Sequence, residues 1–150
     1  MKGEGEQGAS VGLARDIQLV VPIFWLGMVI AISFVEAPIK FKAPGVTLAI
    51  GLGIGRKVFA ALNIVEVVLA VVLSVAWLYA DTDGWLLLVL VSTILVVQVA
   101  VVRPPLTKRS NRVLAGDDGP RSKIHFVYIA LEVVKVLLLV ALTIDLLGQI

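Results

Sequence analysis

The sequence predicts an all-α membrane protein with four transmembrane helices. Hydrophobic residues make up 59% of the 150-residue chain and charged residues only 16%, whereas an ordinary soluble domain carries ~25% charged residues. The apolar residues are also concentrated in four long runs, at about residues 17–35, 58–80, 85–102 and 124–147. Each run reaches the ~17–25 residues that a helix needs to cross a bilayer. We therefore predict one four-helix domain over residues 17–150, with the lipid bilayer as its surroundings.

The segment before the first run is polar. Residues 1–16, MKGEGEQGASVGLARD, are rich in glycine and predict a flexible tail. We do not expect a cleaved signal peptide, because no small-residue cleavage site follows the first run before Glu36. The absence of cysteine excludes disulfides, thiolate chemistry and iron–sulfur clusters. A single histidine excludes a bis-histidine haem within one chain, and no cofactor is predicted.

The connections between the runs differ in length. Residues 81–84, DTDG, are so few that the second and third spans must form a tight antiparallel hairpin. Residues 37–55 begin with prolines that end the first span, and we expect residues 46–54 to form an interfacial or shallow re-entrant piece. The GLGIG motif there precedes a membrane helix and lacks the Walker pattern, so it is not a phosphate loop. Residues 103–123 are polar and predict a short helix between turns.

Basic residues are concentrated in two of these connections, residues 37–57 and 103–123, whereas the opposite side carries only Lys2 and Arg15. The positive-inside rule then places both connections in the cytoplasm and both termini outside the cell membrane. We expect the basic connections to contact anionic lipids. No soluble basic face exists for nucleic acid. The aromatic residues Trp77, Tyr79 and Trp85 suit the outer interface belt, and Trp25 either joins this belt or lies deeper.

The two halves of the chain resemble each other when one is shifted by 66 positions. Polar and helix-breaking residues then match at the same topological places: Pro38 with Pro104, Lys42 with Lys108, Gly53 with Gly119, Lys57 with Lys123 and Glu66 with Glu132. This register predicts two parallel helical-hairpin repeats related by an axis along the membrane normal. Shared composition and topology are the alternative explanation.

Two carboxylates lie near the middle of predicted spans. Glu66 and Glu132 each follow a lysine of the basic connections by nine residues, which at 1.5 Å per residue is about 13 Å into a ~30 Å core. Each lies in a helical stripe about 80° wide, and Gln98 and Glu36 can contribute from the same half. The candidate site residues are Glu66, Asn63 and Arg56 on the second span, Glu132, Lys135, Tyr128 and His125 on the fourth, and Gln98 and Glu36.

These residue types leave two interpretations open. Two carboxylates and one lysine in a dry interior carry one excess negative charge, which favours a bound proton or cation. Alternatively, the residues form a structural clamp in which Glu66 pairs with Lys135, and Glu132 binds Asn63 or Tyr128. Whether a metal binds is unknown from the sequence, since the Glu-x-x-His pairs of helix-bundle metal sites are missing.

The segments GMVIAISFVEAPIKFKAP, GRKVFAALNIVE and HFVYIALEVVK resemble an uncharacterised bacterial family of four-helix membrane proteins. That family is in turn similar to the transmembrane-protein-205 group. The resemblance covers most of the chain from the first span onward. It implies the four-helix fold, and it implies no biochemical activity because the family has no settled one.

We expect a small membrane protein with a carboxylate-lined polar cavity that transports or binds a proton, a cation or a small molecule. One alternative is a membrane-embedded enzyme for a lipid- or quinone-like substrate, with Glu66 and Glu132 as acid and base. Another is an accessory or assembly protein without its own site. The sequence leans against an enzyme. Four helices form a thin wall around a pathway, so we expect a homodimer or a larger homo-oligomer.

Overall fold

The computed structural model describes residues 2–116 and 123–149, and this part of the chain is helical and contains no strand. Four continuous helical stretches are long and apolar enough to cross a membrane, at Gly5–Lys40, Leu48–Trp77, Trp85–Leu114 and Lys123–Leu147. The predicted all-α fold with four spans is therefore confirmed. The elements are α1 Lys2–Val29, η1 Ile30–Glu36, α2 Ala37–Lys40, α3 Leu48–Trp77, α4 Trp85–Val97, η2 Gln98–Val102, α5 Arg103–Leu114 and α6 Lys123–Leu147.

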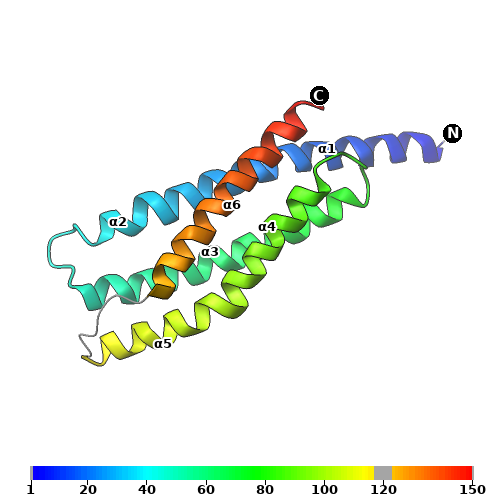
Figure 1. Ribbon diagram of the computed structural model, residues 1–150. Helices are drawn as coiled ribbons and strands as arrows, with labels where there is room; N and C mark the ends of the chain where they lie inside the picture. The colour runs from blue at the N-terminus through cyan, green and yellow to red at the C-terminus, as the bar shows by residue number, and fades with distance from the viewer. Residues whose placement is uncertain (1, 117–122, 150) are drawn as a thin grey trace.

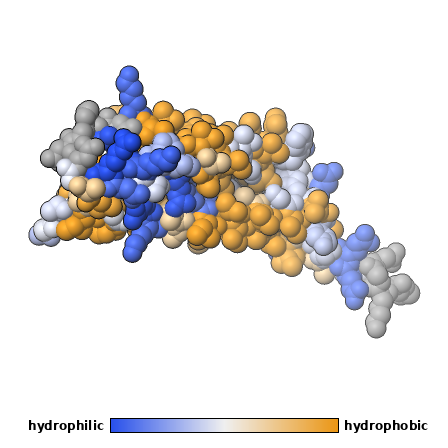
Figure 2. All heavy atoms as spheres, turned by 90° about the horizontal axis from the view of Figure 1, so that it is seen from below, coloured by the Kyte–Doolittle hydropathy of each residue, from blue (hydrophilic) through white to orange (hydrophobic). Residues whose placement is uncertain are grey.

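The long helices form a ring in which α1 and α4 each pack against α3 and α6. Both termini and the turn between α3 and α4 lie at one end of the bundle (Figure 1), which we call the terminal end. The connection between α2 and α3 and the end of α5 lie at the other, the loop end. Hydrophobic residues dominate the surface between the ends, and hydrophilic residues gather toward the loop end (Figure 2). This distribution suits a protein whose sides face lipid.

Three helical stretches extend beyond their predicted bounds, and the third runs from Trp85 to Leu114 without the turn expected before the short helix that begins at Arg103. Residues 2–16 belong to α1, where the sequence predicted a flexible tail. Ala14 is buried against Ala76 and Ala80, so packing on α3 and the following turn extends the helix. Residues 46–54 were expected to form an interfacial or re-entrant piece, but from Leu48 onward they are the first turns of α3. The Thr47 hydroxyl accepts a hydrogen bond from the Ile50 amide at 3.3 Å.

The glycines of GLGIG allow close packing at the start of α3. A Cβ atom at Gly51 would collide with the ring of Phe41, and one at Gly55 would lie 2.9 Å from Lys40 Nζ. The absence of these side chains lets the connection between α2 and α3 fold back onto the helix. The glycines therefore serve packing, in agreement with the sequence argument against a phosphate loop.

Both hairpins contain a π-helical segment just before their prolines. In η1 the Ala37 amide bonds the carbonyl five residues back, and after η2 the Arg103 amide does the same. Proline cannot donate to the regular helical ladder and its ring clashes with the carbonyl four residues earlier. The wider π turns accommodate this defect at Pro38 and Pro104 without ending the helical stretch. The prediction that Pro38 ends the first span is therefore wrong, because this stretch continues to Lys40.

The core repeats between the hairpins in the predicted register. Positions separated by 66 residues are buried in both halves: Trp25 and Val91, Val29 and Leu95, Glu66 and Glu132, and Leu73 and Leu139. Together with the matching π segments, this burial pattern supports two structurally equivalent helical hairpins.

Candidate functional site

A cluster of charged side chains lies in the interior of the bundle, with Lys135 at its centre. Lys135 Nζ lies 2.6 Å from Glu66 Oε1 and 3.2 Å from Glu132 Oε1. It also donates a hydrogen bond to Gln98 Oε1 at 2.8 Å. Lys135, Glu66 and Gln98 are fully buried, and Glu132 is 2% exposed. We call these four residues and their hydrogen-bond partners the charge cluster.

The first hairpin supplies two further donors to the charge cluster. Trp25 Nε1 donates to Glu66 Oε1 at 2.9 Å, and Ser33 Oγ donates to Glu132 Oε2 at 3.3 Å. Gln98 Nε2 also donates to Glu132 Oε1 at 3.0 Å. Ser33 and Gln98 belong to the π segments η1 and η2. These widened turns therefore carry side chains that bond Glu132, and π-helical segments occur frequently at functional sites.

The sequence argument placed Glu66 and Lys135 together, but it missed Ser33 and left the depth of Trp25 open. Trp25 is fully buried, so it does not join the interface belt. Its position in the middle of the first span was the available signal, because belt residues lie near span ends. Ser33 carried no comparable signal, since lone serines are common in transmembrane helices.

The clamp interpretation names the partner of Glu66 and, with Tyr128, one neighbour of Glu132. Glu66 pairs with Lys135 as that interpretation requires. Glu132 also bonds three residues that this interpretation did not assign to it, namely Lys135, Gln98 and Ser33. The ammonium group occupies the position between the two Oε1 atoms where a cation would bind. Across residues 2–116 and 123–149, no group of three or more histidine or acidic residues is arranged to hold a metal ion.

A cavity of about 960 Å³ lies on the loop-end side of the charge cluster. This volume is at the upper end of the ~300–1,000 Å³ range of small-molecule sites. Its deepest polar residues are Asn63, Tyr128 and Glu132, which are 2%, 6% and 2% exposed. We call these three the floor residues. Glu132 thus belongs to the cavity and the charge cluster at once.

The entrance and walls of the cavity have a different chemistry from its floor. Partly exposed cations line the entrance, and we call them the basic rim: Lys40, Arg56, Arg103 and Arg109. His125 lies beside them and is exposed. The walls are mainly apolar and include Phe34, Phe59, Leu52 and Ile129. The Phe59 ring packs edge-on against Tyr128, with centroids 5.5 Å apart, and so joins wall to floor.

Two floor residues have polar atoms that lack a hydrogen-bond partner among the described residues. Both side-chain amide atoms of Asn63 are in this state, and so is the Tyr128 hydroxyl. The Tyr128 hydroxyl faces the Glu132 carboxylate one turn away and interacts with it electrostatically. Glu66 Oε2, one turn from Asn63, is also buried and unpaired. A buried polar atom without a partner costs about 1–3 kcal/mol of folding free energy. These atoms therefore favour the binding of a polar ligand.

The remaining predicted site residues lie nearer the loop end. Arg56 lines the cavity and donates a hydrogen bond to Asn111 Oδ1 of α5. Glu36 forms an ion pair with Lys40 at 3.1 Å and is separate from the charge cluster. The nine predicted residues therefore divide into a buried group and a group around the cavity entrance.

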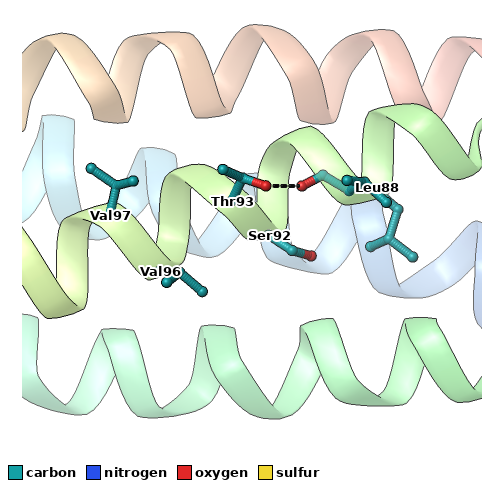
Figure 3. A pocket seen from close by; sticks show the side chains of 6 residues that line it. Leu88, Ser92, Thr93, Val96 and Val97 are labelled. Carbon is teal, nitrogen blue, oxygen red and sulfur yellow. Dashed lines mark hydrogen bonds between the residues drawn. The ribbon is translucent and has the colours of Figure 1, made fainter.

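A second, shallow pocket lies on α4 and is lined by apolar side chains and two hydroxyl-bearing side chains (Figure 3). It measures about 320 Å³ and is lined by Leu88, Val89, Ser92, Thr93, Val96 and Val97. The Thr93 hydroxyl donates to the Val89 carbonyl at 2.7 Å within the same helix. With no charged group and a hydroxyl already bonded, this groove is not a candidate site.

Comparisons of the chain with models of protein families, with curated proteins and with solved structures find no match. The function is therefore inferred from the geometry of the cavity and the charge cluster.

Proposed function

We propose that this membrane protein binds a small molecule in the cavity and carries it between the loop end and the middle of the bilayer. The observation that carries the proposal is Asn63. Its side chain lines the cavity and is 2% exposed, yet both amide atoms lack a partner within the described residues. A ligand that donates to and accepts from this amide removes an energetic cost that the free protein bears. The positive-inside rule would make the cavity entrance cytoplasmic.

The arrangement of the carboxylates favours binding or transport over acid–base catalysis. Glu132 lines the cavity, whereas Glu66 does not and bonds Trp25 and Lys135 in the core. A mechanism with Glu66 and Glu132 as paired acid and base needs both at the substrate. Glu132 instead connects the cavity to a cluster of net formal charge −1, so occupancy can be coupled to a proton shared by that cluster.

The test is native mass spectrometry of the protein released from mild detergent, comparing wild type with Asn63→Leu. We expect wild type to retain a bound small molecule and Asn63→Leu to lose it. The substitution should leave stability unchanged or raise it, because no hydrogen bond to a described residue is lost. Thr93→Val, which makes a similar change on α4 away from the cavity, is the control and should retain the molecule. Equal retention by wild type and Asn63→Leu would contradict the proposal.

A further inference from the structure

We infer that the ligand is an amphipathic organic anion with a neutral hydrogen-bonding group remote from its charged head. This inference rests on the proposed binding function and adds the chemical class of the ligand. It follows from three properties of the cavity: the charge at its entrance, the apolar character of its walls and the unpaired polar atoms at its floor.

The entrance of the cavity is strongly cationic. The basic rim contributes four cations to the lining, of which Lys40 is paired with Glu36, and Glu132 is the single acidic residue among the described lining residues. Glu132 is already paired with Lys135. Arg56 bonds the neutral side chain of Asn111, so this contact leaves the guanidinium charge uncompensated. Guanidinium groups bind carboxylate and phosphate in bidentate geometry, and an anionic head group therefore suits this entrance.

The orientation of the ligand follows from the opposite end of the cavity. The floor adjoins the charge cluster, which contains two carboxylates and one ammonium group. An anion placed there would meet the excess negative charge. The head group therefore lies at the basic rim, and the floor receives a neutral group that can donate to and accept from Asn63 and Tyr128.

The dimensions of the cavity set the length of the ligand. Arg56 at the rim and Asn63 at the floor are seven residues apart on α3, which corresponds to about 10 Å along the helix axis. Between them on α3 the wall includes Phe59, and Phe34 and Ile129 from the facing helices are further apolar lining residues. These side chains favour an apolar chain. An ω-hydroxy carboxylate of about ten carbons joins the two polar ends across this distance.

The test is calorimetric titration of the protein in maltoside micelles with four chain-matched probes. These are ω-hydroxydecanoate, decanoate, ω-hydroxydecyl-trimethylammonium and the neutral decanediol. We expect saturable binding of ω-hydroxydecanoate, with weaker binding of the others. Arg56→Gln should lower the affinity for ω-hydroxydecanoate about tenfold, since a charge-assisted hydrogen bond to the carboxylate is lost. Arg56→Gln should leave the affinity for decanediol unchanged. Arg15→Gln, at the terminal end, is the matched control for micelle charge and should have no effect.

Asn63→Leu separates the two levels of the argument. It should reduce the affinity for ω-hydroxydecanoate to the level of decanoate, and it should leave the affinity for decanoate unchanged. A different result is that the ammonium probe or the diol binds as tightly as the carboxylate, that Arg56→Gln does not change its affinity, and that Asn63→Leu abolishes its binding. The ligand is then not an anion, but the proposed binding site stands. If no probe binds more tightly to wild type than to Asn63→Leu, the floor is not a binding site and both proposals fail.

A competition experiment distinguishes a phospholipid of the bilayer from a single-chain anion of the aqueous phase as the natural ligand. Adding phosphatidylglycerol to the micelles should displace ω-hydroxydecanoate if the natural ligand is a phospholipid of the bilayer. If phosphatidylglycerol does not compete, the natural ligand is a single-chain anion from the aqueous phase. Either result supports an anionic amphiphile, provided that Arg56→Gln weakens the species that binds.

Discussion

Replacing Lys135 with methionine is expected to be the most damaging single change in the interior of the bundle. Methionine matches the length of the lysine chain but removes the ammonium that contacts Glu66 at 2.6 Å, Glu132 at 3.2 Å and Gln98 at 2.8 Å. The formal charge of the cluster changes from −1 to −2. Removing one partner of a buried ion pair typically costs 3–5 kcal/mol. We expect a loss of about 3 kcal/mol in the free energy of unfolding, several times the ~0.6 kcal/mol of an average interhelical hydrogen bond in a membrane.

Companion variants separate the charge from the hydrogen bonds. Glu66→Gln makes the cluster formally neutral, and its amide oxygen can still accept from Lys135 and Trp25. We therefore expect this variant to change the free energy of unfolding by less than about 1 kcal/mol. Adding Glu66→Gln to Lys135→Met returns the formal charge to −1 and should recover part of the loss.

The measurement is equilibrium unfolding in mixed micelles, in which the fraction of a denaturing detergent is raised and tryptophan fluorescence is followed. Thr93→Val, on α4 and outside the cluster, serves as the reference for a polar side chain that bonds only its own helix. The reasoning is refuted if Lys135→Met costs no more than Thr93→Val. It is also refuted if Glu66→Gln costs as much as Lys135→Met, because the negative charge of Glu66 would then be required for folding.

Three further predictions concern other parts of the bundle. Trp25→Phe removes the donor to Glu66 and should cost about 1–2 kcal/mol in the same unfolding assay; an unchanged stability would show that this hydrogen bond has no net value. Gln18 is buried and donates to the carbonyl of residue 80 at 2.9 Å, so Gln18→Leu should cost about 1 kcal/mol, and a gain in stability would contradict a clamping role. The chain has no cysteine, so Lys108→Cys and Asp83→Cys, both at exposed positions, give clean labelling sites. An impermeant thiol reagent should reach Asp83→Cys from outside and Lys108→Cys only from the cytoplasm; labelling of both from one side would overturn the topology.

The position of the buried charges could be predicted from the sequence because it depends on local geometry. Glu132 and Lys135 are three residues apart, and the helical repeat alone places them on one face. Glu66 is expensive to expose to hydrocarbon, so its burial against a cation was a reasonable prediction. The matching prolines at positions 38 and 104 similarly indicated equivalent places in the two hairpins. All of these inferences use the period of the helix and the cost of charge in lipid.

Long-range packing decided the rest. The hydrogen bonds from Ser33 and Gln98 to Glu132 depend on how α1 and α4 lie against α3 and α6. The hydrogen bond from Trp25 to Glu66 depends on the same packing. The sequence alone established the number of spans, the polar stripes and the excess charge, because hydrophobicity and helical periodicity act within a segment. Only the tertiary structure separated Glu66, which pairs with Lys135, from Asn63 one turn away on the same helix, which has no hydrogen-bond partner among the described residues. Whether a buried polar group meets a partner or a cavity depends on the shape of the neighbouring helices, which its own segment does not encode.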